Sequence, residues 1–274
     1  MAASDYILLS DSEKERLQLQ ARVWQAETER LLDTIGVQAG WECLDLGCGA
    51  MGILGPLSRR VAENGRVSGL EMDGKLLAAA QQYVVDEGLT NVALKQGDAY
   101  QSGFSSESFN LVHERFVMPH VVDPAALLQE IIRMTKPNGI VIIQEPDHSS
   151  WNFWPYSEKW SQLLPILESA LALRGDINIG RQTFQLARQA GYAAVCSAYG
   201  GYNFPGDDAF HLQRFHGDPQ TVRLKNWLMI DPRKCRAPRY EYGDCSFVSA
   251  NRTTAGLDRD GQRRGHRTDN VFHC

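Results

Sequence analysis

The sequence predicts an α/β protein with an open, doubly wound, mostly parallel sheet. Short apolar runs alternate with helical stretches, and these stretches are long enough to cross a sheet face between two parallel strands. Five apolar runs are expected to be strands. Their starts lie 24, 26, 17 and 30 residues apart, and they occupy residues 42–46, 66–71, 92–96, 109–113 and 139–144.

The segments between these strands are expected to be helices because their apolar residues recur at helical spacing, at residues 53–63, 75–87 and 125–135. Asp123 and Pro124 open the third of them, since Asp is a favourable N-cap and proline suits the first helical position. A turn at 136–139 is expected to end this helix and to begin the fifth strand. Helices near 157–173 and 180–190 and a sixth strand at 193–199 are expected to follow.

The regions on either side of this pattern differ from it. Ser10 and Glu13 form a capping-box pattern, and one long amphipathic helix is expected to run from there to about Gly36. Residues 231–274 contain eight arginines but only three aliphatic side chains, so they can add little to a core. We expect an N-terminal helical cap (1–38), a main domain (39–230) and an atypical, arginine-rich C-terminal tail (231–274) that is disordered or foreign to the fold.

Composition and charge exclude several classes of protein. The chain has 43% hydrophobic and 22% charged residues, as folded globular proteins do, and its net charge of −5 gives no basic field for nucleic acid. Its six cysteines form no C-x-x-C pair, so neither a zinc site nor a disulfide framework is expected. We find no basic leader followed by an apolar core and no run of about 18 apolar residues that could span a membrane. A cytoplasmic protein without a metal is the resulting expectation.

A glycine-rich segment follows the first predicted strand. Gly47, Gly49 and Gly52 match the pattern G-x-G-x-x-G at the start of the next helix. Such a loop lets a ligand lie against the backbone and leaves helix N–H groups free, which suits either a dinucleotide pyrophosphate or the aminoacyl part of S-adenosylmethionine (SAM). Asp45 favours SAM, because a carboxylate at the strand end would repel a pyrophosphate and attract an ammonium group.

Acidic residues also end the second and third predicted strands. Glu71 can accept hydrogen bonds from both ribose hydroxyls of either cofactor. Asp98, which Ala99 follows, can accept from the adenine amino group, while Met72 packs on the adenine ring. Three carboxylates at successive strand ends therefore favour a cationic, phosphate-free adenosyl ligand over NAD.

These motifs resemble those of class I SAM-dependent methyltransferases, over about residues 5–200. A closer similarity to the small-molecule methyltransferases of quinone and natural-product biosynthesis lies in residues 115–124 and 136–139 and in Tyr6, Glu13, Arg16, Leu17 and Gln20. The resemblance implies a Rossmann-like fold, SAM as cofactor and methyl transfer to a small-molecule acceptor such as a quinone or natural product. Ala50 and Met51 depart from the usual glycine loop. The arginine-rich tail stands in place of the C-terminal helix and seventh strand expected in such enzymes.

Residues beyond the later strands are candidates for catalysis, since ligands of open α/β sheets bind beyond the carboxyl ends of the strands. His120 is the first candidate for a general base, and His113 and Glu145 are further catalytic candidates. His120 could instead pack or cap the following helix, and His113 and Glu114 could line the cofactor without moving a proton.

The parts of the chain around the expected methyl group supply further candidates. Tyr6 and Gln20 are expected to close over the methionine end of SAM or to anchor the N-terminal helix. Aromatic residues at 151–156 could roof a pocket for an apolar or aromatic acceptor, or pack in the core. Two other functions stay open: a catalytically inactive SAM-binding module, and an NAD(P)-dependent oxidoreductase, which would leave Asp45 and Asp98 unexplained.

Overall fold

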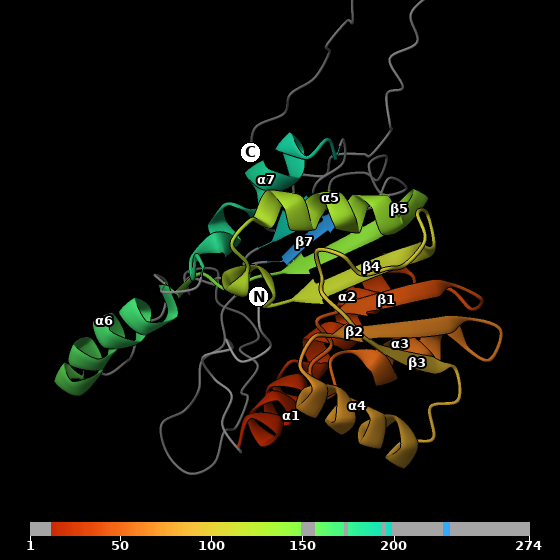
Figure 1. Ribbon diagram of the computed structural model, residues 1–274, viewed down its shortest axis with the longest axis horizontal. Coiled ribbons are helices and arrows are strands. Elements are labelled where there is room, and N and C mark those ends of the chain that lie inside the picture. The colour runs from red at the N-terminus through yellow and green to blue at the C-terminus, as the bar shows by residue number, and fades with distance from the viewer. Residues whose placement is uncertain (1–11, 149–156, 173–174, 193–195, 199–226, 231–274) are drawn as a thin grey trace, which may run out of the picture.

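The computed structural model describes residues 12–148, 157–172, 175–192, 196–198 and 227–230 (Figure 1). These residues form a seven-stranded sheet with the order β3-β2-β1-β4-β5-β7-β6. The first five strands pair in parallel and confirm the predicted doubly wound fold: β1 (Glu42–Leu46), β2 (Arg66–Glu71), β3 (Val92–Gln96), β4 (Phe109–Arg115) and β5 (Thr135–Gln144).

The far edge of the sheet holds the strand that the sequence analysis did not expect. Strand β7 (Trp227–Ile230) inserts between β5 and β6 (Cys196–Ala198) and pairs antiparallel with both. The expectation that the tail replaces the seventh strand is therefore wrong, because a short apolar run just before the tail supplies it. The predicted sixth strand is confirmed at 196–198, while 193–195 and 199 lie outside the described residues, as does the tail itself.

Helices cross between the strands where the apolar spacing predicts them: α3 (Leu54–Val61), α4 (Gly74–Asp86) and α5 (Pro124–Met134). The Asp123 side chain accepts from the N–H of Ala126 at 3.0 Å, which confirms the predicted cap. The Asp73 side chain caps α4 in the same way, at 2.8 and 2.9 Å from two backbone nitrogens. The later helices are also confirmed, as α6 (Glu158–Ala172) and α7 (Thr183–Gln189).

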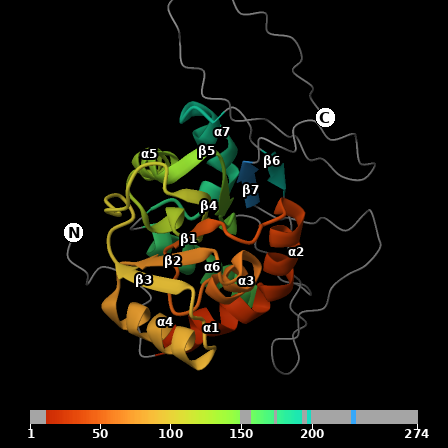
Figure 2. The ribbon, with the colours of Figure 1, turned by 90° about the vertical axis from the view of Figure 1, so that its right-hand side faces the viewer.

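The two faces of the sheet bury two separate apolar clusters, because alternate residues of a strand point to opposite faces. On one face, Leu44, Val112 and Val141 pack with α5 and α7. On the other, Cys43, Leu111 and Ile142 pack with α2, α3 and α4. Figure 2 shows α5 and α7 on one side of the sheet and α1 to α4 on the other. Successive residues of β1, β4 and β5 therefore point alternately to the α5 and α7 side and to the α2, α3 and α4 side of the sheet.

The N-terminal region forms two helices, not the single helix that was expected. These are α1 (Glu13–Val23) and α2 (Gln25–Ile35), which meet at Trp24 and end at Gly36. The Trp24 indole packs edge-on against the Phe116 ring, with centroids 5.8 Å apart, so the chain changes direction where it meets the loop after β4. Ser10 of the predicted capping box lies outside the described residues, and Glu13 forms an ion pair with Arg16.

The turn expected at 136–139 is part of β5, because pairing with β4 already begins at Thr135. The register shifts between Phe109 and Leu111, and Asn138 has a φ of +63°. The turn residues are therefore accommodated as an irregularity inside the strand, and regular pairing follows from Ile140 onward.

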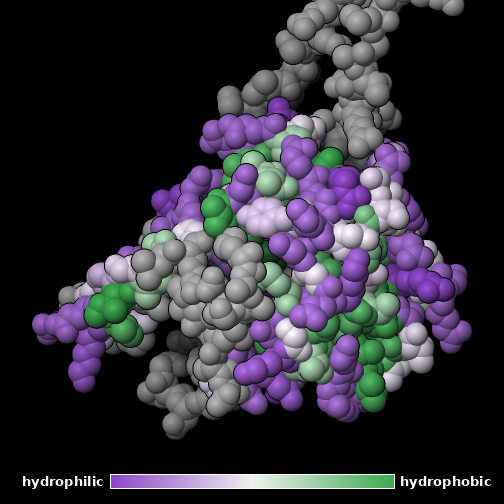
Figure 3. Space-filling model, viewed as in Figure 1, coloured by the Kyte–Doolittle hydropathy of each residue, from purple (hydrophilic) through white to green (hydrophobic). Residues whose placement is uncertain are grey.

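Helix α6 extends away from the sheet (Figure 1), and its side chains Leu163 and Ile166 are exposed. Figure 3 shows hydrophobic side chains on the surface of this projecting helix. In the described part of the chain, no helix is both long and apolar enough to cross a membrane. Within the same residues, no group of three or more His, Cys, Asp or Glu side chains is arranged to hold a metal ion.

Candidate functional site

The glycine loop between β1 and α3 is tied to two neighbouring strand ends. The N–H groups of Gly47 and Cys48 donate to the carbonyl of Leu70 at 2.8 and 3.0 Å. The N–H of Gly49 donates to the Glu71 carboxylate at 2.9 Å, and that of Ile53 donates to Asp45 at 2.8 Å. The loop is thus fixed at both ends, just beyond the carboxyl ends of β1 and β2.

Two of the predicted glycines are required by both conformation and space. Gly47 and Gly52 have φ values of +70° and +50°. A Cβ at Gly47 would lie 2.4 Å from Val117 Cγ2, and one at Gly52 would lie 2.0 Å from Asp45 Oδ2. Neighbouring side chains therefore already occupy the space that any other residue would need.

Asp45 belongs to a buried hydrogen-bonded row that crosses three adjacent strands. Its carboxylate is 2% exposed and accepts from Ile53 N–H and, at 2.7 Å, from His113 Nδ1. His113 is 1% exposed, and its Nε2 lies 2.9 Å from the side-chain oxygen of Gln144. All three side chains continue the α3 face of the sheet. This geometry favours a positioning role for His113 over proton transfer, since protein groups contact both of its ring nitrogens.

The residues predicted to hold the nucleoside lie together at the ends of β2 and β3. Glu71 accepts from the N–H groups of Gly49 and Asp73, each at 2.9 Å. Burial raises the pKa of Glu71, and these backbone donors act against that shift. Met72 is 50% exposed, and Asp98 is exposed while accepting from Tyr100 N–H at 2.9 Å. Ala99 packs beside them against the α5-side core.

Helix α1 covers the glycine loop. Leu17 packs with Ala50 and with α4, and its Cδ1 lies 3.4 Å from where a Cβ of Gly49 would be. Gln20 follows on the same helix and accepts from Arg16 at 3.2 Å. This contact of Gln20 is thus within its own helix, and Tyr6 lies outside the described residues.

The three remaining candidates differ sharply in exposure: Glu114 lies near the end of β4, His120 follows β4, and Glu145 follows β5. Glu114 and Glu145 are 0% and 2% exposed. Burial raises the pKa of Glu114 to about 7 and that of Glu145 well above its ordinary value. His120 ends the 3-10 helix η1 (Met118–His120) and is exposed. The sequence analysis named three catalytic candidates, His113, His120 and Glu145. Of these, His120 is exposed to solvent, whereas His113 and Glu145 are buried.

The aromatic positions at 151–156, which the sequence predicts to roof a pocket or to pack in the core, lie outside the described residues. His148 is buried, and its Nδ1 contacts the carbonyl of Ile177 at 2.5 Å. Burial lowers the pKa of His148, since it disfavours the charged form.

Three residues of the site were missed by the sequence analysis. Gln144 completes the row from Asp45, and the signal was a single polar residue directly after the apolar run at 140–143. Val117 covers Gly47, and Phe116 has a φ of +61°, which is unusual for an aromatic residue. Both residues lie in 115–124, which carries the family resemblance, but the sequence does not predict their roles, because these depend on contacts between distant segments.

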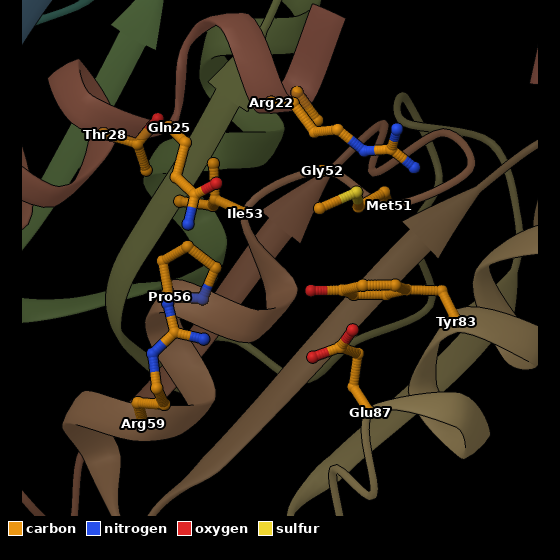
Figure 4. A pocket seen from close by; sticks show the side chains of 11 residues that line it. Arg22, Gln25, Thr28, Met51, Gly52, Ile53, Pro56, Arg59, Tyr83 and Glu87 are labelled. Carbon is orange, nitrogen blue, oxygen red and sulfur yellow. The ribbon is translucent and has the colours of Figure 1, made fainter. Parts of the chain in front are cut away.

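A cavity of about 250 Å³ lies behind the glycine loop, between the α1–α2 junction and helices α3 and α4. Figure 4 shows Met51 and Gly52 on one side, the Tyr83 side chain reaching across toward Pro56, and Arg22 nearby. Of the predicted site residues, only Gly52 lines it. The cavity is therefore separate from the carboxyl ends of the strands.

The fold is a Rossmann-like α/β sheet, with a glycine loop and carboxylates at the carboxyl ends of its first three strands. A family model described as a methyltransferase domain matches residues 38–193, and the chain belongs to this family. The chain is 34% identical over 124 residues to the demethylmenaquinone methyltransferase of Bacillus cytotoxicus, covering 45% of this chain and 51% of that protein. It is 31% identical over 164 residues to an uncharacterized 37.1 kDa protein in transposon TN4556 of Streptomyces fradiae, covering 60% and 46%. The chain thus spans about half the length of these relatives.

Solved structures share the fold at lower identity. Phosphoethanolamine N-methyltransferase 2 of Haemonchus contortus, solved with S-adenosyl-L-methionine, superimposes with a TM-score of 0.54 at 20% identity, over 73% of this chain and 46% of that one. A Methanococcus maripaludis protein assigned to the S-adenosyl-L-methionine-dependent methyltransferases gives a TM-score of 0.54 at 14% identity, over 84% and 96%. At such identities the likeness shows the fold alone.

Proposed function

We propose that the protein transfers a methyl group from SAM to a small-molecule acceptor. The observation that carries the proposal is the set of carboxylates at the ends of β1, β2 and β3, gathered around a glycine loop in a chain of the methyltransferase domain family. A sulfonium and an ammonium group are both cations, and carboxylates at this edge attract them. When bound, SAM supplies the electrophilic methyl group.

The described residues fit an adenosyl ligand. Glu71 is held in place by two backbone N–H groups and keeps acceptor lone pairs for ribose hydroxyls. Exposed Met72 can pack on the adenine ring, and exposed Asp98 can accept from its amino group. Asp45 supports the glycine loop, where the methionine part would lie, through its hydrogen bond with the N–H of Ile53.

For the acceptor, we propose a ring that bears a hydroxyl group, such as a phenol or a reduced quinone. The resemblance to demethylmenaquinone methyltransferases supports this class. Loss of the hydroxyl proton would require a base within hydrogen-bond reach, and exposed His120 at the carboxyl edge is the candidate. Glu145 is buried below that edge and is better placed to hold backbone than to reach an acceptor. A cytoplasmic location and the absence of a nucleic-acid partner belong to the same proposal.

Binding and turnover measurements test this function against its two alternatives. We expect SAM and S-adenosylhomocysteine (SAH) to bind in calorimetric titrations and NAD to give no heat, whereas preferential NAD binding would reject the cofactor assignment. We then expect methyl transfer to members of a panel of phenols, quinols and amines. SAM binding with no turnover on any of them would support an inactive binding module.

Glu71→Ala is expected to weaken SAM binding by about 1–3 kcal/mol, because both the ribose hydroxyls and the Gly49 N–H lose their acceptor. The measurement is the dissociation constant for SAM by calorimetry. Glu63→Ala is the matched control, since Glu63 is exposed and lies at the opposite end of β2. Equal affinity in the two variants would contradict the placement of the ribose at Glu71.

A further inference from the structure

Two carboxyl groups are buried side by side at the ends of β4 and β5. Glu114 and Glu145 both lie on the α5 face of the sheet, opposite to the row of Asp45, His113 and Gln144. The charged groups that act on the pair are the two carboxyls themselves and Asp45 on β1. Two ionised carboxylates this deeply buried would repel each other and lose their hydration, so at least one proton is retained between them.

The pair holds the backbone of the segment that follows β4. Glu145 Oε1 accepts from Met118 N–H at 2.8 Å, and Glu114 Oε2 accepts from Val117 N–H at 3.3 Å. The other two oxygens, Glu114 Oε1 and Glu145 Oε2, are buried with no other hydrogen-bond partner among the described residues. A proton on Glu145, donated to Glu114, satisfies both of them.

The segment of residues 116–120 packs over Gly47, the first glycine of the loop, through Val117. Val117 Cγ2 lies against Gly47, so closely that a Cβ there would be 2.4 Å away. Phe116 is held at a φ of +61°, with its N–H donating to the carbonyl of Gln144 at 2.9 Å. An aromatic residue in this conformation is strained, and the contacts around it must supply the energy that keeps it there. The two carboxyl groups bond the next two backbone N–H groups along the chain, those of Val117 and Met118.

We propose that Glu114 and Glu145 are positioning residues that share a proton, and that this proton fixes residues 116–120 over Gly47 and so keeps the cofactor end of the site formed. The inference rests on the proposed SAM site. Glu145 acts as donor to Glu114 and as acceptor from Met118, while Glu114 accepts from both Glu145 and Val117. Loss of the shared proton leaves two facing carboxylates, and their repulsion releases the segment.

The sign of the pH dependence follows from the raised pKa values. A carboxyl group whose pKa is higher in the folded than in the unfolded state stabilises the fold at low pH and loses that contribution as pH rises through its folded pKa. For Glu114 the window runs from about 4.5 to about 7, and for Glu145 it extends further upward. The hold of Glu114 and Glu145 on residues 116–120 is therefore expected to weaken above neutral pH.

The test compares the wild-type protein with Glu145→Gln, Glu145→Ala and the exposed control Glu63→Gln. Glutamine keeps both hydrogen bonds of Glu145, since its amide donates to Glu114 and its oxygen accepts from Met118, but it has no proton to lose in this range. The readouts are the thermal midpoint of the ligand-free protein and the SAH affinity, each between pH 7 and 9.5. The SAH ammonium titrates in every variant alike, so its effect cancels in the comparison.

We expect the wild type and Glu63→Gln to lose thermal stability over this range, and to lose SAH affinity by up to tenfold per pH unit once the shared proton dissociates, as the linkage of a single proton gives. Glu145→Gln should bind SAH at pH 7 as the wild type does and lose little of either quantity at pH 9.5, while Glu145→Ala should bind weakly throughout. The inference is overturned if Glu145→Gln follows the wild-type pH dependence, or if it binds as weakly as Glu145→Ala at pH 7. Absence of SAH binding to the wild type at any pH would instead overturn the proposed function, and this inference with it.

Discussion

Asp45→Ala is expected to lower the free energy of unfolding by about 3 kcal/mol and to weaken SAM binding by about 1–3 kcal/mol. The carboxylate is buried, and its two oxygens accept from Ile53 N–H and His113 Nδ1. Alanine leaves both donors without an acceptor inside the protein. It also removes the contact that holds the end of the glycine loop at the start of α3.

Thermal unfolding measures the first effect, and about 3 kcal/mol corresponds to a fall of roughly 6–12 °C in a domain of this size. Asp86→Ala is the control, because Asp86 is exposed on α4 and bonds only to the Gln82 side chain in the described structure. Its change should stay within about 0.5 kcal/mol. A thermal midpoint for Asp45→Ala equal to that of Asp86→Ala would contradict the role assigned to the buried row.

Gly52→Ala is expected to be comparably destabilising, by about 3 kcal/mol, and to reduce SAM affinity. Its φ is +50°, and the new Cβ would lie 2.0 Å from Asp45 Oδ2 and 2.8 Å from the carbonyl oxygen of Cys48. Either the loop backbone or the Asp45 carboxylate must move. Both movements disturb the loop on which the cofactor would lie.

Gly88→Ala separates the two causes of this effect. Gly88 has a φ of +63° but nothing within 4 Å of an added Cβ, so it carries the conformational cost of about 1 kcal/mol without the overlap. The double variant Asp45→Ala/Gly52→Ala should cost less than the sum of the single changes, because the carboxylate that meets the new Cβ is gone. A Gly52→Ala protein as stable as Gly88→Ala, or strict additivity in the double variant, would contradict the overlap.

Local patterns predicted most of the framework correctly. The five parallel strands, the helices between them and the cap at Asp123 each follow from the spacing of apolar residues or from one side chain bonding to nearby backbone. The set of residues at the carboxyl edge was also predictable, because parallel strands end at one edge and their terminal residues must meet there. The wrong expectations, at Trp24, at 136–139 and at β7, fall where a distant segment sets the local conformation.

The same division holds inside the site. The sequence by itself determined that acidic residues surround a glycine loop, since this depends only on which residue ends each strand. Only the tertiary structure decided what each acid does: Glu71 stays near the surface of the loop, Asp45 turns inward to His113, and Glu114 faces Glu145. The physical reason is that the position of a residue along a strand determines which face of the sheet its side chain points to. How deeply that side chain is buried, and which partners it finds there, depend on segments far away in the chain.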